Sequence, residues 1–224
     1  MKTEPGCIPC LLRQAVEVGE LAFAGDAAGR EAVMREALRV AHAADWSQPP
    51  PLLAQALHRW VRARCGADPY RDIKRRCTQT GLRLLPDLRR RVEAADDRLG
   101  TALRLAAAGN ILDAGLVSDL SDAAVDRAIA AALACPLDPG EPTQAVAALR
   151  AARRIVYLAD NCGELVFDRL VLDLLGHAQV TLVVKGRPIL NDATREDVVA
   201  SGLTGVDLRD NGDDAPGTVL ASTA

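Results

Sequence analysis

The chain has 224 residues, of which 49% are hydrophobic, 25% are charged and only 3% are aromatic. This composition is typical of a folded globular protein, and a net charge of −3 argues against nucleic-acid binding, which requires a basic surface. Arginine-rich stretches at residues 71–76 and 89–91 lie near acidic residues, so we interpret them as solvated helix faces. No stretch approaches the roughly 18 consecutive apolar residues of a membrane span, and the N-terminus lacks the layout of a secretory signal. We therefore expect no membrane span and a cytoplasmic location.

Residues 1–142 have helical periodicity, which predicts an N-terminal helical domain. Prolines at positions 49–51 suit the start of the third helix, and Pro86 is expected to interrupt the fourth. The breaker-rich stretch 135–142 (CPLDPGEP) predicts the transition to a second domain. The predicted helices of this part span residues 11–22, 33–44, 52–61, 70–84, 87–99, 101–108 and 123–134.

Residues 143–224 predict an α/β domain. After a helix at 143–152, apolar β-branched runs at 155–159 and 180–184 predict buried strands, separated by a helix at 164–175. A strand–helix–strand unit of this kind normally makes a right-handed parallel crossover. A Thr194/Asp197 capping box predicts a short helix at 194–200, and residues 206–209 predict a third strand. The expected architecture is a helical domain followed by a three-layer, Rossmann-like α/β domain, which is apparently truncated at its C-terminus because only three strands are visible.

Polar residues directly follow the first two strands of this sheet. Asp160 and Asn161 follow the first strand, and Lys185, Arg187 and the pair Asn191-Asp192 follow the second. Ligands of open α/β sheets bind outside the carboxyl ends of the strands, so we expect these side chains to converge. Carboxylate and amide oxygens suit magnesium, which also leaves room for a substrate phosphate. The N-terminus of the helix after Asn161 would face that phosphate.

These motifs resemble the DUF89 family, also called ARMT1-like damage-control phosphatases. The resemblance rests on DNCGE at 160–164, FD at 167–168, KGRP at 185–188 and NDAT at 191–194. CIPC at 7–10, DPY at 68–70 and GNILD at 109–113 resemble its small prokaryotic branch. The resemblance implies a helical domain beside an α/β domain and a divalent metal ion (Mg, Mn, Co or Ni). It also implies hydrolysis of small phosphate monoesters, such as sugar phosphates or damaged phosphometabolites.

The resemblance assigns Asp160, Asn161 and Asp192 as metal ligands. The family normally continues into a segment with a K-G-x-G-N motif, expected to hold the substrate phosphate, and this sequence ends before such a segment. The family also tends to have asparagine where Thr78 stands.

Further side chains are candidates for the reaction. Glu164 is a catalytic candidate that would orient water or bind a sugar hydroxyl, and the alternative is a favourable acid in the first turn of a helix. Substrate-binding candidates are Lys185, Arg187, Asn191 and, from the helical domain, Asp113. For the two basic residues the alternative is a pair of solvated loop charges.

The cysteines suggest no complete zinc site. Cys7 and Cys10 form a CxxC motif without a second suitably spaced pair, which favours a buried structural pair at a helix start. The alternative is a second metal site completed by Cys77. The spacing of Cys65 and Cys77 predicts core positions, whereas Cys162 at a helix N-terminus is a candidate for an acidified thiol.

Three hypotheses remain. The first is a metal-dependent phosphatase that acts on a small phosphorylated metabolite. The second is a Rossmann-like cofactor enzyme such as a methyltransferase, with Asp160 holding a ribose, although the G-x-G-x-x-G fingerprint is absent. The third is a truncated, non-catalytic remnant that binds metal or a partner. The sequence makes no prediction of the oligomeric state.

Overall fold

The computed structural model describes residues 2–112, 122–134 and 141–219. These residues pack into two compact units. The first, here called the helical unit, contains the chain up to Asp72 together with Gly186–Leu190 and the described residues from Gly212 onward. The second, here called the sheet unit, contains Ile73–Lys185 and Asn191–Asn211. The predicted boundary near residue 142 stays a prediction, because this grouping reports packing and not independent folding.

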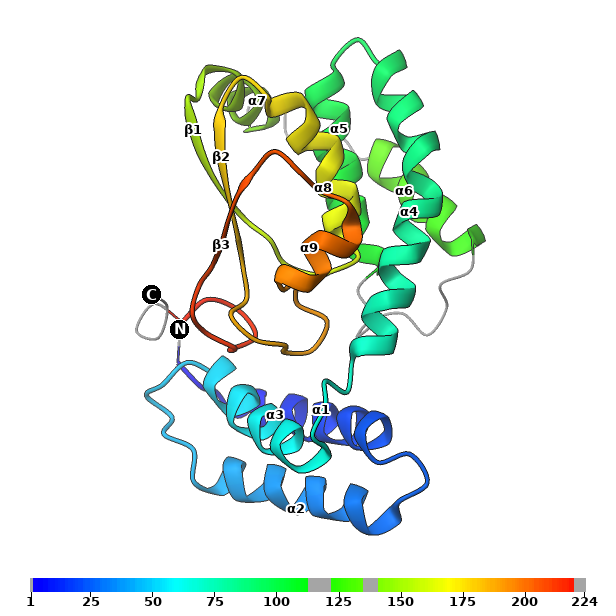
Figure 1. Cartoon of the computed structure of the whole chain (residues 1–224). Coiled ribbons are helices and arrows are strands. Elements are labelled where there is room, and N and C mark those ends of the chain that lie inside the picture. The colour runs from blue at the N-terminus through cyan, green and yellow to red at the C-terminus, as the bar shows by residue number, and fades with distance from the viewer. Residues whose placement is uncertain (1, 113–121, 135–140, 220–224) are drawn as a thin grey trace. The chain divides into compact units, whose positions relative to one another are not determined.

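Three helices form the body of the helical unit (Figure 1): α1 (Cys7–Ala22), α2 (Ala27–His42) and α3 (Pro51–Cys65). Their apolar faces meet at Val18, Val33 and Leu57, which are fully buried. Such apolar spacing makes each helix stable only when it is packed against the others. The Asp26 carboxylate caps α2 by accepting a hydrogen bond from the Gly29 amide, and Gly66 ends α3 in the left-handed conformation.

The sheet unit contains a parallel three-stranded sheet in the order β1-β2-β3. This order confirms the predicted strand–helix–strand crossover and the α/β class. The strands are β1 (Arg154–Leu158), β2 (Gln179–Val184) and β3 (Asp207–Asp210). The helical elements are α4 (Arg71–Ala94), α5 (Arg98–Ala108), the 3₁₀ turn η1 (Gly109–Leu112), α6 (Asp122–Ala134), α7 (Glu141–Ala151), α8 (Glu164–Leu172), the 3₁₀ turn η2 (Asp173–Leu175) and α9 (Arg195–Ser201).

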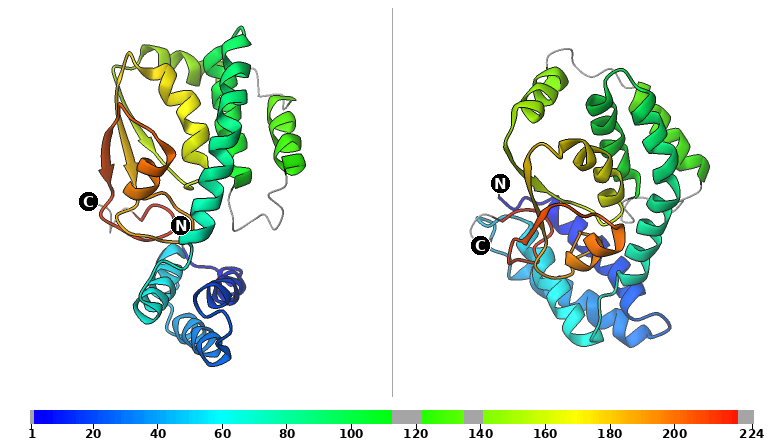
Figure 2. Two further views of the ribbon diagram at one scale, coloured as in Figure 1. Left: turned by 45° about the vertical axis from the view of Figure 1, so that its right-hand side comes forward. Right: turned by 45° about the horizontal axis from the view of Figure 1, so that its top comes forward.

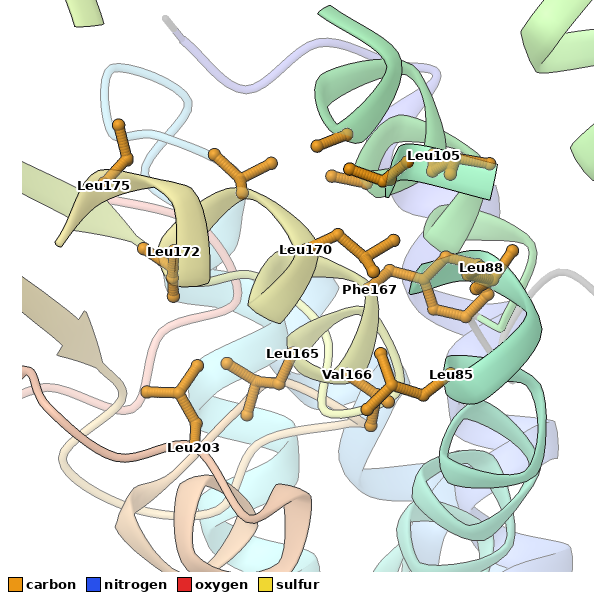
Figure 3. Packing of buried hydrophobic residues seen from close by; sticks show 14 of the residues in the cluster. Leu85, Leu88, Leu105, Leu165, Val166, Phe167, Leu170, Leu172, Leu175 and Leu203 are labelled. Carbon is orange, nitrogen blue, oxygen red and sulfur yellow. The ribbon is translucent and has the colours of Figure 1, made fainter. Parts of the chain in front are cut away.

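Helix α8 lies between the sheet and the helices α4 and α5, as the left view of Figure 2 shows. Phe167 and Leu170 on α8 pack toward Leu88 on α4 and Leu105 on α5 (Figure 3). Two glycines allow this close approach. A Cβ at Gly81 would lie 3.0 Å from the Val166 Cβ, and one at Gly109 would lie 2.9 Å from the Phe167 Cβ. The largest group of buried apolar side chains is therefore centred on α8.

The sheet face that points away from α8 is apolar and exposed to solvent at β1. Val156 is 69% exposed and Leu158 is 64% exposed, and none of the described residues covers them. The prediction that residues 155–159 form a buried strand is therefore wrong for this face. A continuous apolar run is expected when helices cover both faces of a parallel strand, and here the described helices cover one.

Helix α4 continues through Pro86, so the predicted interruption is also wrong. A proline inside a helix removes one backbone hydrogen bond and costs about 3 kcal/mol. Leu85, Leu88 and Val92 on the same helix are buried in the core of the sheet unit, and this packing offsets the cost. No helix in the described part of the chain is long and apolar enough to cross a membrane.

Candidate active site

The loops after β1 and β2 are joined by the segment 191–194. Asn161 and Asp192 form an antiparallel bridge, and the Cys162 amide donates a hydrogen bond to the Asn191 carbonyl at 2.9 Å. The Ala193 amide donates to the Asp160 carbonyl at 2.7 Å. The two acid–amide pairs, thirty residues apart in sequence, are thus neighbours along the backbone.

The second strand contributes to the same framework. The Lys185 amide at the end of β2 donates a hydrogen bond to the Ala193 carbonyl at 2.9 Å. Asp160 is exposed, whereas the other candidate residues here are buried: Asn161, Lys185, Asn191 and Asp192. The framework therefore places polar side chains inside the protein, with one exposed carboxylate beside them.

The amide of Asn161 has a fixed orientation. Its Nδ2 donates a hydrogen bond to Glu164 Oε1 at 2.7 Å. Because the nitrogen is committed to Glu164, only Oδ1 of this amide can act as a ligand for a cation. Glu164 lies in the first turn of α8, so this helix positions Asn161.

The carboxylate of Asp192 is buried with little electrostatic compensation. Its Oδ2 is buried and has no hydrogen bond among the described residues, and the Lys185 ammonium lies 3.5 Å away. Burial, aided by the charge of Asp160, raises the pKa of Asp192 to about 7, although Lys185 and Lys74 oppose the change. A buried carboxylate without sufficient partners is costly, so this position favours an additional cation.

The residues present fit a hard divalent cation. Asp160 and Asp192 offer carboxylate oxygens and Asn161 offers an amide oxygen, which are the ligand types that magnesium and manganese take. No group of three or more His, Cys, Asp or Glu side chains in the described ranges has the arrangement of a metal site. A set of two carboxylates and one amide suits an ion that keeps several waters, as magnesium does.

Lys74 is a site-supporting residue that the sequence did not reveal. It is 4% exposed, and its Nζ lies 2.6 Å from Asp197 Oδ2. The same carboxylate oxygen accepts hydrogen bonds from the Thr194 amide and hydroxyl, which confirms the predicted capping box. The interpretation of residues 71–76 as a solvated face is wrong for Lys74. Its partner lies more than a hundred residues away, so no local pattern could have indicated the pair.

Cys162 does not have the reactive thiol that the sequence suggested. Its side chain is fully buried and donates a weak hydrogen bond to the Lys74 carbonyl at 3.7 Å. Burial strongly raises the pKa of this thiol, so it stays protonated at neutral pH. Cys77 is also fully buried, as predicted, whereas Cys65 is only half-buried.

In the helical unit, a charged network holds the loop Gly186–Leu190. Arg62 on α3 donates hydrogen bonds both to the Pro188 carbonyl and to the Asp214 carboxylate. Gln55 Nε2 donates to Asp214 Oδ1 at 2.8 Å and to Asp213 Oδ1 at 2.6 Å. Burial acts to raise the pKa of Asp214, but the hydrogen bonds from Arg59, Gln55 and Arg62 outweigh it and lower the pKa.

Arg187 lies in the loop that this network holds and is exposed. It belongs to the helical unit, whereas Lys185 belongs to the sheet unit. Asp113, the other predicted substrate contact, lies outside the described residues. Cys10 is exposed and Cys7 is half-buried, so the prediction of a buried cysteine pair is wrong, although the motif does begin a helix.

Comparisons with known proteins identify the family. The model of the damage-control phosphatase ARMT1-like domain matches residues 3–224. A protein named damage-control phosphatase from Archaeoglobus fulgidus is 30% identical over 230 residues, which cover 98% of this chain and 78% of the relative. Another of that name from Pyrococcus horikoshii is 24% identical over 207 residues, covering 91% of this chain and 70% of the relative.

A solved structure shares the fold. The crystal structure of a DUF89 family protein from Pyrococcus horikoshii has a TM-score of 0.87 and 23% sequence identity, and the match covers 100% of this chain and 79% of that chain. The family match over nearly the whole chain supports a phosphatase in general terms. The chain therefore belongs to the ARMT1-like damage-control phosphatase family.

Proposed function

We propose that the chain is a metal-dependent phosphatase that hydrolyses small phosphate monoesters, such as sugar phosphates or damaged phosphometabolites. The observation that carries the proposal is Asp192 Oδ2, a buried carboxylate oxygen beside the Asn161 loop whose ion pair with Lys185 Nζ is long, at 3.5 Å, and which accepts no shorter hydrogen bond among the described residues. The ligands in this proposal are Asp160, Asn161 and Asp192. The ion would be Mg, Mn, Co or Ni. When bound, such an ion polarises phosphoryl oxygens and promotes the ionisation of water.

Other side chains of the protein would position the metal ligands and bind the substrate. Glu164 positions Asn161 by accepting the hydrogen bond from its Nδ2. Lys185 provides a cation next to Asp192, and Arg187, two residues further along the chain, would provide a guanidinium suited to phosphate geometry. Helix α8 starts at Glu164 without a side-chain cap, and the Leu165 and Val166 amides donate to the Asn161 and Gly163 carbonyls at 3.3 and 3.4 Å. The helix would therefore favour a phosphate through the positive end of its dipole. Asn191 is the proposed contact for polar groups of the substrate other than its phosphate.

The test is hydrolysis of p-nitrophenyl phosphate by the purified full chain in each of the four metals and in EDTA. We expect turnover only with metal. Asp160→Asn and Asp192→Asn should each lower kcat/KM by at least about 100-fold, because each would remove a ligand charge. The matched control is Asp173→Asn, an exposed acid paired with Arg89 on the surface, which should leave the rate unchanged. Full turnover in EDTA would contradict the proposal.

The same preparation separates the two rival functions. In a thermal-shift experiment, stabilisation by manganese with no turnover of any phosphate ester would support a non-catalytic metal-binding remnant. Stabilisation by S-adenosylmethionine or NAD, but by no metal, would support a cofactor-binding enzyme. We also propose a cytoplasmic location, a reducing compartment in which the described cysteines would stay free thiols.

A further inference from the structure

Cys7 and Cys10 lie in the first turn of α1 and play no part in the proposed phosphatase chemistry. Both are free thiols, and Cys10 is exposed while Cys7 is half-buried. Each sulfur accepts a weak hydrogen bond: Cys7 Sγ from the Glu4 amide at 3.5 Å, and Cys10 Sγ from Gln14 Nε2 at 3.7 Å. The fully buried Cys77 and Cys162, by contrast, are inaccessible to reagents in solution.

Both thiols line one pocket in the helical unit, with a volume of about 320 Å³. Its wall is mainly apolar, with prolines and aliphatic side chains from the start of α3. Gln14 also lines the pocket, and its Oε1 is a buried acceptor without a hydrogen bond among the described residues. The remaining wall is formed by Gly6, Leu11, Pro50, Pro51, Leu53, Ala54 and Pro216. A small molecule with an amide donor could therefore approach the sulfurs.

The first turn of α1 has no side-chain cap at Gly6, but its backbone is closed by hydrogen bonds from the Cys7 amide to the Glu4 carbonyl at 2.9 Å and from the Ile8 amide to the Pro5 carbonyl at 3.3 Å. Residues three apart on a helix have Cβ atoms roughly 5–6 Å apart, whereas a disulfide requires about 3.5–4.5 Å. Formation of a disulfide therefore requires the two Cβ atoms to move closer together, by a local rearrangement of this uncapped turn.

A zinc site fits the motif less well. Zinc in structural sites takes four ligands, usually cysteine and histidine. No group of three or more His, Cys, Asp or Glu residues suited to a metal is found in the part of the chain that the structure describes. Two thiols beside a mainly apolar pocket instead suit reaction with a small sulfur compound.

We propose that Cys7 and Cys10 form a redox-active dithiol that exchanges with low-molecular-weight disulfides. The Cys10 thiolate attacks one sulfur of a disulfide RS–SR, which forms a Cys10–S–S–R bond and releases RS⁻. The Cys7 thiolate then attacks Cys10 Sγ, which forms the Cys7–Cys10 bond and releases a second RS⁻. Two protein thiols are oxidised, one small disulfide is reduced to two thiols, and the two protons pass to the released thiolates. This proposal is independent of the phosphatase reaction.

The test uses the reduced full chain with glutathione disulfide, followed by trapping with N-ethylmaleimide, intact mass measurement and peptide mapping. We expect Cys7 and Cys10 to carry neither N-ethylmaleimide nor glutathione, and the peptide that contains them to be lighter by two hydrogen atoms than its reduced form. The new bond should map to Cys7 and Cys10, and dithiothreitol should restore both thiols. Cys7→Ser should instead accumulate a glutathionyl adduct on Cys10, because the second attack is impossible.

Cys65→Ser is the matched control, since Cys65 is a half-buried thiol in the same unit that has no neighbouring cysteine in sequence. It should form the Cys7–Cys10 bond to the same extent as the parent chain. A parent chain that stays fully labelled by N-ethylmaleimide would overturn the proposal. So would a stable glutathionyl adduct on Cys10 in the parent, or stoichiometric zinc in the reduced protein that Cys7→Ser releases.

Discussion

Lys74 on α4 and Asp197 on α9 form a buried ion pair, with 2.6 Å between Nζ and Oδ2. The carboxylate also accepts two hydrogen bonds from Thr194, two residues after the candidate ligand Asp192. One carboxylate therefore joins the start of α9 to α4. The loop that carries Asp192 is thus held at two points: at Asp192 by the bridge to Asn161, and at Thr194 by the hydrogen bonds to Asp197. Both attachments restrict its position.

Replacing Lys74 should destabilise the protein strongly. In Lys74→Met the Asp197 carboxylate stays buried without its cation, which typically costs about 3–5 kcal/mol. We expect this loss in the free energy of unfolding measured with urea. The double variant Lys74→Met/Asp197→Asn should recover part of it, because the unpaired charge is removed. A loss below about 1 kcal/mol in the single variant would contradict a buried pair.

Gly186 should not tolerate a side chain. A Cβ there would lie 2.9 Å from the Gly212 carbonyl carbon and 3.0 Å from the Asp213 amide nitrogen, and backbone cannot rotate aside. Gly186→Ala should lower the free energy of unfolding by about 1–3 kcal/mol. Gly176→Ala is the control, since nothing lies within 4 Å of its Cβ position and its φ of −59° suits alanine. Equal melting temperatures for the two variants would refute this account.

His58 should make the protein less stable in mild acid. Burial, aided by the charge of Arg62, lowers its pKa to about 4, from 6.5 in the unfolded chain. The unfolded state therefore binds the proton first, and stability falls as the pH drops from 6.5 to 4, by roughly 3 kcal/mol. His58→Gln should flatten this part of the stability curve. His42→Gln, at an exposed position, should leave it unchanged.

Asp168 should have the opposite pH dependence. Burial raises its pKa to about 7, although the hydrogen bond from the Tyr157 hydroxyl at 2.6 Å opposes the shift. The folded state therefore holds a proton that the unfolded state releases near pH 4, and stability falls as the pH rises from 4 to 7, by roughly 4 kcal/mol.

Asp168→Asn tests this directly, because the amide oxygen can still accept the Tyr157 hydrogen bond but cannot ionise. The variant should be more stable than the parent at pH 8 and similar to it at pH 4, as measured by urea unfolding. A parent and a variant with parallel stability curves across this range would show that Asp168 ionises normally.

Local sequence patterns predicted much of the fold. Periodicity located the helices, the Thr194/Asp197 pair located the start of α9, and the strand–helix–strand order predicted the parallel sheet. Pro86 was misjudged because helix propensity is local, whereas the packing of Leu85 and Leu88 that compensates for it is not. The open face of β1 was missed for a similar reason, because an apolar run does not indicate which face is covered.

For the candidate site, the sequence predicted that the Asp160-Asn161 and Asn191-Asp192 pairs would meet at one edge of the sheet, and the backbone bridge joins them. Their role as ligands stays a prediction. The supporting contacts of Lys74 and Asp214 were not predictable, because each joins segments more than a hundred residues apart. Short-range patterns reveal turns and caps, but they carry no information about such distant partners.

The raised pKa of Asp192 makes protons competitors of any dication at this site. Burial leaves the carboxyl group partly protonated at pH 7, whereas a carboxylate ligand must be ionised. Uptake of manganese near neutral pH should therefore expel a fraction of a proton, and the heat of binding should vary with the ionisation enthalpy of the buffer. Acidification should therefore weaken the binding of a dication at this position.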